Sequence, residues 1–563
     1  MNAVVSFFDP AIRFQRAYAE YLRARFRSVP CPGARYALET TWVEPRGWRA
    51  ALARHARITI TGAPGAGKTT TLAYLAITAA RNLLQNPHAR VPLFFPARTE
   101  PTLPRIYDLP AALHLNDTLA AQAPRIFFAN VFATGRALVL IDDADALDPD
   151  TVRAALKEYQ NATIIATAEH ALPDFAEYRL PGWHDHQIAQ LARKLDLPDA
   201  IAFVAALKTH NVPRALSAHP LTATLLARLW HSNKTLATNR TDLFDAFART
   251  LLGETNGTLV ALEDLGLAMQ RERAVTNGLL AKSRGLLRAT RNRGVEFAHD
   301  LWQAYFAARA LRRAPDLAPL RPHLTDPAWR EVILFYAGLG DATDLILNLQ
   351  SQGATSLAAR AAAHARTLRA DLRAAIRQDL QTRAWNGDAD ALAVLSEMND
   401  PAIADEWATR LNHPDSTIRL RAVEMLGRLQ TDRCVDVLLP QLRQSDGALR
   451  DKVVEALSHA YTDRVIEPLL VALRGDARLG MTDARLRLAA AQALGEIASE
   501  KAVPALLVEL QIGESAGRAA AADALKNIHS PLMIETLQSL TQSPEDELRR
   551  YAQEILAIAN DQN

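Results

Sequence analysis

Cysteine is scarce in this chain of 563 residues, in which Cys31 and Cys434 are the two examples. Two cysteines so far apart make neither a disulfide framework nor a metal site, so we expect a reducing, cytoplasmic location. An excess of one charge is also missing, because the formal net charge is +2 with 22% charged residues. Overall charge therefore indicates no acidic or basic partner.

Long apolar runs are absent as well. No stretch reaches the roughly 18 apolar residues that a membrane-spanning helix needs, so we expect no membrane association. The N-terminal segment has no basic leader, and Asp9 and Pro10 interrupt its apolar run, which argues against a signal peptide. Hydrophobic residues still make up 49% of the chain, enough for several cores. The length predicts roughly three to five domains.

The most informative stretch is RITITGAPGAGKTTT at residues 57–71. A short β-branched run stops at a complete G-x-x-x-x-G-K-T motif, and a helical apolar pattern follows. This order of strand, glycine loop and helix predicts a phosphate cradle, against the alternative of a chance glycine-rich turn. The predicted nucleotide-binding residues here are Gly62, Ala63, Pro64, Gly65, Ala66, Gly67, Lys68, Thr69 and Thr70.

The residue types in this motif suit a nucleotide phosphate chain. Glycines let backbone amides turn inward, and these amides form a nest with the helix N-terminus. We expect Lys68 to place its charge at the β- and γ-phosphates, and the Thr69 hydroxyl to bind Mg²⁺. The expected cofactors are ATP or ADP with Mg²⁺.

Further apolar runs predict additional strands at 91–95, 137–143 and 163–167. A fully apolar run that ends in an acid delivers a carboxylate to the carboxyl edge of a parallel sheet. We therefore expect Asp142 to join Thr69 as a metal ligand, against the alternative of an ordinary acidic turn. The predicted catalytic group is Asp142, Asp143 and Asp145. Strands alternating with helices predict a doubly wound parallel α/β sheet over residues 51–185.

The order of motifs resembles the NACHT class of STAND signal-transduction P-loop ATPases over residues 50–345. The acidic segment at 142–147 is similar to the family's D-G-hydrophobic-D-E-L, and His219-Pro220-Leu221 is similar to its proline motif. Residues 297–308 resemble its winged-helix signature F-x-H-x-x-x-Q-E-Y-x-A-A, and 329–339 resemble the W-x-E-V-I segment that follows. The resemblance implies that Pro220 packs on the adenine and that His299 binds the β-phosphate of ADP. The alternative for His299 is an ordinary core residue.

Two positions depart from the family pattern. Ala146 stands where the family has a glutamate, and Glu169 stands where an arginine often follows the fourth strand. Losing a carboxylate that orients water, and a cation near the γ-phosphate, predicts slow ATP hydrolysis at most. Asp143 or Asp145 could still position the water.

The last third of the chain repeats. Arg419, Arg450, Arg487, Arg518 and Arg549 occupy equivalent points, each followed by a small and apolar helix pattern. This two-helix unit resembles the HEAT family in the short form of phycobilin-lyase-like repeats, and such units must stack to bury their faces. The repeated arginine predicts a pair with a neighbouring unit, or alternatively a ligand contact. A longer spacing predicts a loop near residues 475–482.

These patterns divide the chain into six parts: an N-terminal helical segment (1–50), a P-loop NTPase core (51–185), a helical lid (186–252), a winged helix (253–313), a helical bridging region (314–395) and a HEAT sensor region (396–563). The first part is interpreted as a solvated helix or a docking surface. The bridging region contains an arginine face, which indicates solvation, ion pairs or an acidic partner, with nucleic acid as a minor alternative: Arg360, Arg366, Arg369, Arg373 and Arg377.

The sequence favours a nucleotide-dependent signalling switch. An unknown protein or other trigger would bind the HEAT repeats, and the active form would assemble into a homo-oligomer. The family resemblance implies a role in bacterial antiphage or stress responses. The main alternative is a nucleotide-stabilised HEAT scaffold that hardly hydrolyses ATP. A chromophore lyase is disfavoured because no catalytic set accompanies the repeats.

Overall fold

The computed structural model describes residues 9–31, 34–45, 47–98, 102–113, 115–210, 212–253, 256–271, 283–289, 294–443, 446–460, 462–475, 484–528 and 530–560. Two compact units divide the chain, residues 1–181 and 182–563. Within the described residues, no helix is both long and apolar enough to cross a membrane.

The first unit is built on a five-stranded parallel sheet with the order β4-β5-β6-β3-β7. Four of these strands, β3 to β6, agree closely with the predicted ones. The edge strand β7 was not predicted because its residues, Ala-Glu-Tyr-Arg, alternate between half-buried and exposed positions and lack an apolar run. The bounds are β3 (Arg57–Thr61), β4 (Val91–Pro96), β5 (Ala137–Asp142), β6 (Thr163–Thr167) and β7 (Ala176–Arg179).

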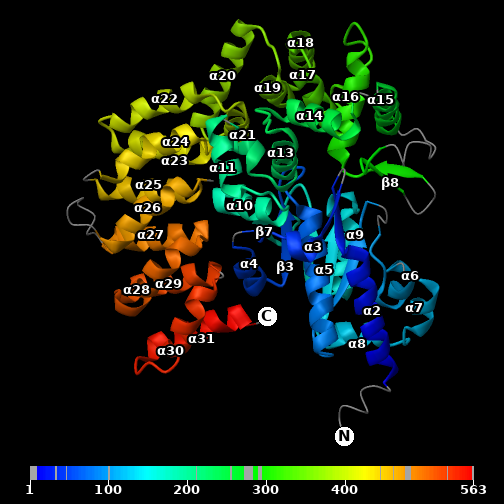
Figure 1. The fold of residues 1–563 in the computed structure, drawn as a ribbon, viewed down its shortest axis with the longest axis vertical. Coiled ribbons are helices and arrows are strands. Elements are labelled where there is room, and N and C mark those ends of the chain that lie inside the picture. Colours follow the sequence, from blue (N-terminus) through cyan, green and yellow to red (C-terminus); the bar gives the residue numbers. More distant parts are fainter. Residues whose placement is uncertain are drawn as a thin grey trace. The chain divides into compact units, whose positions relative to one another are not determined.

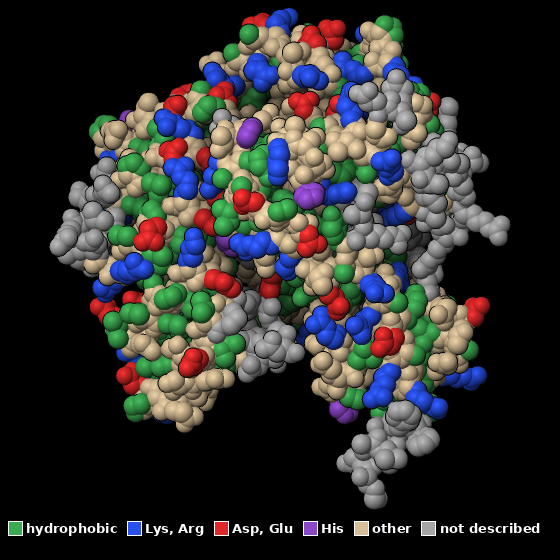
Figure 2. Space-filling model, viewed as in Figure 1, with side chains coloured by type: hydrophobic (Ala, Val, Ile, Leu, Met, Phe, Trp, Pro, Cys, Tyr) green, Lys and Arg blue, Asp and Glu red, His purple; other side chains and the backbone are tan. Residues whose placement is uncertain are grey.

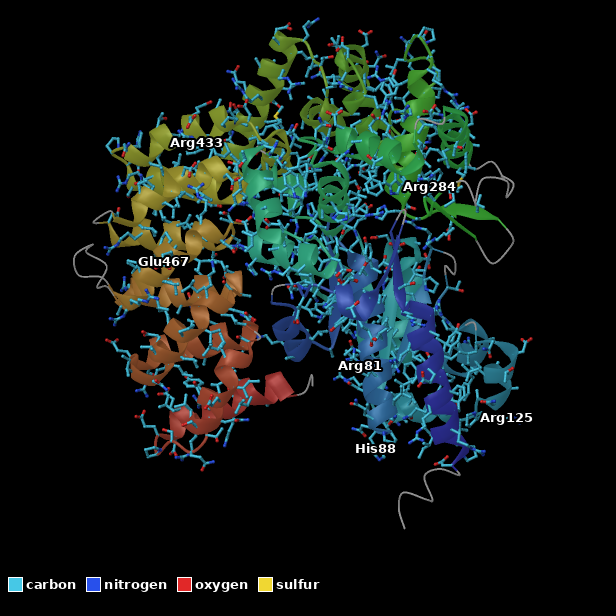
Figure 3. The ribbon with its side chains drawn as sticks, viewed as in Figure 1. Arg81, His88, Arg125, Arg284, Arg433 and Glu467 are labelled. Atoms are coloured by element: carbon cyan, nitrogen blue, oxygen red, sulfur yellow. The ribbon has the colours of Figure 1, made fainter. Side chains whose placement is uncertain are left out.

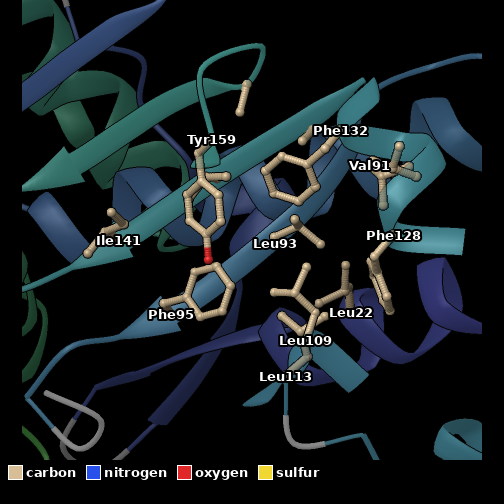
Figure 4. Close-up of a cluster of buried hydrophobic side chains, with 14 of the residues drawn as sticks. Leu22, Val91, Leu93, Phe95, Leu109, Leu113, Phe128, Phe132, Ile141 and Tyr159 are labelled. Atoms are coloured by element: carbon tan, nitrogen blue, oxygen red, sulfur yellow. The ribbon is translucent and has the colours of Figure 1, made fainter. Parts of the chain in front are cut away.

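Both faces of this sheet are covered, as the fully apolar strands require. Successive residues of a strand point to opposite faces, so Leu93 and Phe95 enter one buried cluster while Phe94 enters the other. Figure 4 shows the first cluster, in which Phe95 lies near Tyr159 and Leu93 near Phe132. The helices of this unit are α4 (Trp48–Arg54), α5 (Lys68–Gln85), α6 (Leu109–Ala112), α7 (Asp117–Gln122), α8 (Phe127–Ala133) and α9 (Pro149–Glu158).

The N-terminal segment belongs to the first unit. Helix α2 (Pro10–Phe26) packs along α5, and Phe14 and Tyr18 are buried in the first cluster. The Tyr18 hydroxyl donates to the Pro92 carbonyl of β4 at 2.7 Å. The apolar stripe of α2 is therefore a core element. A hairpin, β1 (Ser28–Cys31) and β2 (Ala34–Ala37), and the short helix α3 (Leu38–Thr41) follow it.

The second unit begins with helices α10 to α15. Those within residues 185–252 coincide with the segment expected from the sequence to form a lid (186–252) and are called the lid helices below. An antiparallel hairpin of β8 (Leu287–Ala289) and β9 (Val295–Phe297) precedes helix α16 (Asp300–Arg312). Phe297 is the last residue of β9, and α16 begins at Asp300. The preceding helices are α10 (Asp185–Lys194), α11 (Ala200–Thr209), α12 (Arg214–Ser217), α13 (Pro220–Asn233), α14 (Arg240–Leu252) and α15 (Asn256–Gln270).

The bridging region is helical, as predicted, but its alanine-rich stretch is not one continuous helix. Helix α19 ends at His364, and α20 begins at Ala370 after a segment that bonds back to the α17–α18 region, where the Arg366 N–H donates to the Ala337 carbonyl at 3.2 Å. Tertiary contacts here override helix propensity. The helices are α17 (Arg330–Gly338), α18 (Thr343–Ser351), α19 (Thr355–His364), α20 (Ala370–Trp385) and α21 (Ala389–Met398).

The remaining helices stack in chain order as an α-solenoid, yellow to red in Figure 1. The predicted loop near 475–482 lies largely outside the described residues, which stop at 475 and resume at 484. The helices are α22 (Pro401–Thr409), α23 (Ser416–Leu429), α24 (Asp432–Leu438), α25 (Gly447–Ser458), α26 (Ile466–Arg474), α27 (Ala484–Ile497), α28 (Val503–Ile512), α29 (Ser515–Asn527), α30 (Ile534–Leu540) and α31 (Asp546–Asn560).

Two glycines show how closely the second helices of neighbouring repeats approach. A Cβ added at Gly427 would lie 2.5 Å from the Ala456 Cβ, and one added at Gly495 would lie 2.6 Å from the Ala524 Cβ. Real Cβ atoms do not come this near, so the small side chains set the spacing between repeats.

Candidate functional site

The glycine motif forms a turn between β3 and the N-terminus of α5. Gly65 and Gly67 have φ values of 83° and 93°, which an L side chain rarely adopts, so glycine is required at both. Lys68 opens the helix, and its Nζ atom donates to the Gly62 carbonyl at 2.6 Å, which folds the side chain back over the loop. Sequence reasoning therefore placed the turn and the helix start correctly.

The structure brings Thr69 and Asp142 together, as the metal-site prediction requires. The Thr69 hydroxyl donates to Asp142 Oδ1 at 3.0 Å across the carboxyl edge of the sheet. Thr167, at the end of β6, donates to the same oxygen at 2.8 Å. Because β6 lies between β3 and β5, its last residue is well placed to orient the Asp142 carboxylate.

Asp143 and Asp145 also lie at this edge but differ from Asp142 in their partners. Asp143 adopts a left-handed backbone with φ 56°, and its N–H donates to the Thr167 hydroxyl at 2.8 Å. Asp145 accepts from the backbone N–H of Glu169 at 2.6 Å. The three predicted catalytic acids are thus held by hydrogen bonds to Thr167, the last residue of β6, and to Glu169, two residues after it.

The electrostatic balance at this edge is acidic. Lys68 is surrounded by the carboxylates of Asp142, Asp143, Asp145 and Glu169, which favour its charged form, yet desolvation by burial outweighs them and lowers its pKa. For Asp142, burial, together with the nearby Asp143, raises the pKa to about 6, although the Thr167 and Thr69 hydrogen bonds oppose the shift. A cation at this place would relieve the crowding of negative charge.

The available ligands fit Mg²⁺ bound together with phosphate oxygens. Among the described residues, no group of three or more His, Cys, Asp or Glu side chains is placed to hold a metal by itself. Mg²⁺ generally keeps only one or two protein ligands and takes the rest from waters and substrate phosphates. Thr69 and Asp142, already 3.0 Å apart, match that pattern.

Sequence reasoning missed Arg98 and did not single out Thr167. Arg98 follows β4, and its Nε atom lies 3.4 Å from Asp143 Oδ2. Neighbouring strands of a parallel sheet end at one edge, so a polar residue after any of the strands was a candidate. The sequence did not show that β4 lies next to β5, so it did not indicate that Arg98 lies beside Asp143.

Pro220 and His299, the two predicted nucleotide contacts outside the loop, belong to the second unit. Pro220 is the first residue of α13, where proline is favoured, so it has a helix-starting role of its own. His299 caps α16: its Nδ1 accepts from the Leu301 N–H at 3.1 Å. In that tautomer Nε2 carries the proton. His299 is therefore the N-terminal capping residue of α16.

A second polar cluster joins the lid helices to the solenoid within the second unit. Asp185, at the start of α10 and 4% exposed, accepts from Arg214 Nη1 at 2.5 Å and lies 2.8 Å from Lys208 Nζ. The same carboxylate accepts from the Thr462 hydroxyl and the Asp463 N–H, both at 3.2 Å. Arg214 and Lys208 hold the pKa of Asp185 below its usual value despite its burial.

The solenoid contributes to this cluster through a repeated tripeptide, Thr-Asp-Arg, at 431–433 and 462–464. Asp432 lies 3.4 Å from Arg214 Nε, and Asp463 lies 2.9 Å from Nδ1 of His186. In both copies the threonine caps the helix that begins there. Equivalent aspartates of two consecutive repeats therefore contact the lid helices, and two identical tripeptides 31 residues apart were a readable signal for this contact.

The third residue of each tripeptide faces the preceding repeat. Arg433, labelled in Figure 3, lies 2.7 Å from Asp405, and Arg464 lies 2.5 Å from Asp436. The arginine thus fixes the position of the loop whose aspartate contacts the lid.

The arginine repeated at 419, 450, 487, 518 and 549 pairs mainly with neighbouring repeats. Arg419 lies 3.0 Å from Asp446 and also donates to the His413 carbonyl at 2.9 Å. Arg518 makes the same kind of pair with Glu545, at 2.6 Å. At Arg419 and Arg518 the predicted pair with a neighbouring repeat is therefore present. Arg549 instead pairs with Asp546 of its own helix.

The arginine face of the bridging region is largely engaged with acids. Arg360 bonds to Asp390 and Glu397, and Arg377 lies 3.0 Å from Asp400. In the view of Figure 2 basic and acidic side chains are intermingled over the described surface. These contacts favour the ion-pair alternative over a surface dedicated to nucleic acid.

Comparison with known proteins identifies one part of the chain. A family profile described as HEAT repeats matches residues 404–479 and 477–557, so this region consists of HEAT repeats. No curated protein matches the chain. Among solved structures, an engineered protein shares 23% identity over 39% of this chain and 96% of its own, with a TM-score of 0.24.

Two natural proteins give equally weak likenesses. Human deoxyhypusine hydroxylase in complex with glycerol shares 18% identity over 45% of this chain and 91% of its own, with a TM-score of 0.20. The Aeropyrum pernix ORC1 protein in complex with DNA shares 15% identity over 50% of this chain and 96% of its own, with a TM-score of 0.26. Scores this low carry no argument about function. The firm result is a parallel α/β sheet and a C-terminal array of HEAT repeats.

Proposed function

We propose that this protein is a nucleotide-dependent signalling switch of the NACHT type. The phosphate loop binds ATP or ADP with Mg²⁺, and the HEAT repeats receive a protein or other trigger. The observation that carries the proposal is the contact of Thr69 with Asp142 beside a loop in which Gly65, Gly67 and Lys68 have the conformations a phosphate cradle needs.

Each residue of the site has a distinct task in this proposal. Backbone amides of residues 62–67 and the N-terminus of α5 bind phosphate oxygens, and Lys68 neutralises the β- and γ-phosphates. Thr69 and Asp142 hold Mg²⁺, which supplies charge neutralisation when bound. Asp143 and Asp145 are the candidates to position the attacking water. The family resemblance adds Pro220 as the proposed contact of the adenine and His299 as the proposed contact of the β-phosphate.

The cluster around Asp185 gives the HEAT repeats a physical connection to the lid helices. Asp432 and Asp463 of the solenoid contact Arg214 and His186, and α10 begins at Asp185 itself. A trigger bound to the solenoid can shift the nucleotide state only through a difference in its affinity for the two arrangements. The proposed path for that difference runs through this cluster, and the active form assembles into a homo-oligomer in a defence or stress response.

A second function, a nucleotide-stabilised HEAT scaffold with little hydrolysis, has its own support. Ala146 cannot orient water, and Glu169 adds a negative charge where a γ-phosphate would lie. Single-turnover hydrolysis with Mg²⁺ distinguishes the two functions. The switch predicts slow turnover that Asp142→Asn abolishes, and the scaffold predicts no turnover in either protein.

The direct test is to purify the protein, denature it and identify any released nucleotide by ion-exchange chromatography. A stoichiometric adenine nucleotide is expected. The purified protein is then stripped of nucleotide, and ADP and ATP are titrated with Mg²⁺ by calorimetry. Failure to bind either nucleotide refutes both functions.

A further inference from the structure

Strand β4 delivers a cation to the nucleotide edge of the sheet. Its register pairs Pro96 with Asp142, and the Ala97 N–H donates to the Asp142 carbonyl at 2.9 Å. Arg98 is the next residue, so the backbone of the sheet places it beside the end of β5. Its Nε atom lies 3.4 Å from Asp143 Oδ2.

The surrounding charges explain why a cation is needed here. The carboxylates of Asp142, Asp143, Asp145 and Glu169 all act on Lys68, so the edge carries more negative than positive charge even with Arg98 included. A polyphosphate entering this edge meets repulsion from Glu169 in particular. The family pattern that the sequence resembles often has an arginine at the position of Glu169, whereas in this chain strand β4 supplies the arginine.

We propose that Arg98 is the γ-phosphate-binding cation of this protein and that its pair with Asp143 is the form present when no γ-phosphate is bound. The proposal rests on the proposed function, because it requires that the loop binds ATP. It assigns to Arg98 the γ-phosphate contact that the resembled family pattern assigns to an arginine at position 169, where this chain has glutamate.

The pair is weak enough to exchange partners. The Arg98 side chain is 60% exposed and that of Asp143 is 37% exposed, so water and salt screen their attraction. A phosphate group offers the planar guanidinium two charged oxygens and binds it more strongly than a single exposed carboxylate oxygen does. ATP therefore takes Arg98 away from Asp143, whereas ADP, which lacks the γ-phosphate, leaves the pair intact.

Release of Asp143 has a consequence for the attacking water. The freed carboxylate is available to accept a hydrogen bond from that water, which is the positioning role proposed for Asp143 above. Arg98 thus couples recognition of the γ-phosphate to the availability of the group that positions the water.

The test compares Arg98→Ala with the wild-type protein in ADP and ATP binding and in single-turnover hydrolysis. We expect ADP affinity to change less than twofold, ATP affinity to fall about tenfold and hydrolysis to fall at least as much. Arg98→Lys should recover part of the ATP affinity. The double variant Arg98→Ala/Glu169→Arg, which moves the charge back to the end of β6, should recover most of it.

Arg125→Ala, a change to an exposed arginine of the same unit (Figure 3), is the matched control and should leave both affinities unchanged. Thermal unfolding of each variant checks the fold, and Arg98→Lys replaces Arg98→Ala if the latter is unstable. An Arg98→Ala protein that melts normally and keeps the wild-type ratio of ATP to ADP affinity overturns the role of Arg98 alone. A wild-type protein that binds no nucleotide overturns the proposed function as well.

Discussion

The two charged clusters of this protein have similar chemistry and opposite surroundings. At the nucleotide edge, Arg98 and Asp143 form an ion pair whose side chains are 60% and 37% exposed. Between lid and solenoid, Arg214 and Asp185 form one whose side chains are 8% and 6% exposed. An exposed pair contributes about 0–1 kcal/mol and exchanges partners readily. Removing one member of a buried pair strands the other and costs about 3–5 kcal/mol.

This difference matches the two tasks. A site that must accept and release a polyphosphate benefits from groups whose present partners are weak. An interface between two sets of helices benefits from buried charged groups, which cannot exchange their partners for water. The comparison leads to four predictions, from the largest effect to the smallest.

Substituting Asp185 should destabilise the second unit most. Asp185→Ala leaves Arg214 buried without its main partner, and we expect a loss of about 3–5 kcal/mol in the free energy of unfolding, measured by urea denaturation. Asp436→Ala, which removes the 38%-exposed partner of Arg464, is the control and should cost about 0–1 kcal/mol. Equal losses of stability in the two variants would show that burial does not determine how much these two ion pairs contribute to stability.

Lys68→Ala should weaken nucleotide binding about 100-fold, because it removes a charge-assisted contact to phosphate. The repeats lie in the other unit, so their urea denaturation should not change. Isothermal titration with ADP and Mg²⁺ measures the affinity. An unchanged affinity for ADP would show that Lys68 does not contact the bound nucleotide.

Filling the contact between repeats should have a moderate effect. At Gly495 an alanine Cβ would meet Ala524 at 2.6 Å, so we expect Gly495→Ala to cost about 1–3 kcal/mol of stability. Gly257, in helix α15, has nothing within 4 Å of its added Cβ, so Gly257→Ala should be neutral or stabilise by up to about 1 kcal/mol. If both variants unfold at the same denaturant concentration, the tight stacking of repeats is not limiting.

The pH dependence of Mg²⁺-linked binding should be the smallest effect. Asp142, with a pKa raised to about 6, must lose its proton to bind the metal. Mg²⁺-dependent affinity should therefore fall about tenfold between pH 7 and pH 5. The Asp142→Asn variant is the control for protonation of the nucleotide itself, and its affinity should not show the fall that is due to Asp142. An equal fall of affinity in both proteins would contradict the assignment of the pH dependence to Asp142.

The same shift has a consequence for stability with a definite sign. The folded pKa of Asp142 exceeds the unfolded value, so the native state holds more protons between about pH 4 and pH 6. The contribution of Asp142 to the free energy of unfolding is therefore most favourable at low pH, and it is lost as the pH rises through 6. Asp185, whose pKa is lowered, acts in the opposite sense and stabilises the fold above its unfolded pKa.

Much of the first unit was predictable because short-range patterns specify it. Val91–Pro96 and Ala137–Asp142 are apolar runs that only a covered parallel strand accommodates, and Thr69 was placed by its motif. The strand β7 and the residue Arg98 escaped prediction. Both depend on which strands lie side by side, a property that local sequence does not encode.

In the second unit the period of the repeats and the pairs between neighbouring repeats were readable, but the partners of Asp185 were not. The spacing of Arg419 and Arg518 predicted pairs with neighbouring repeats, and these were found. Asp185 gave no signal, because an aspartate at a helix start is ordinary. Its role arises from Thr462 and Asp463, 277 and 278 residues away.

The paired tripeptides at 431–433 and 462–464 limit how the solenoid can change in length. Repeat arrays gain or lose whole units during evolution, and each unit contacts only its neighbours. A unit inserted between Asp432 and Asp463 would carry one of these aspartates away from His186 or Arg214, whereas a unit added after Ile497 would leave both in place. Growth of this array is therefore tolerated at its C-terminal end, and the stretch that holds the lid has a fixed number of units.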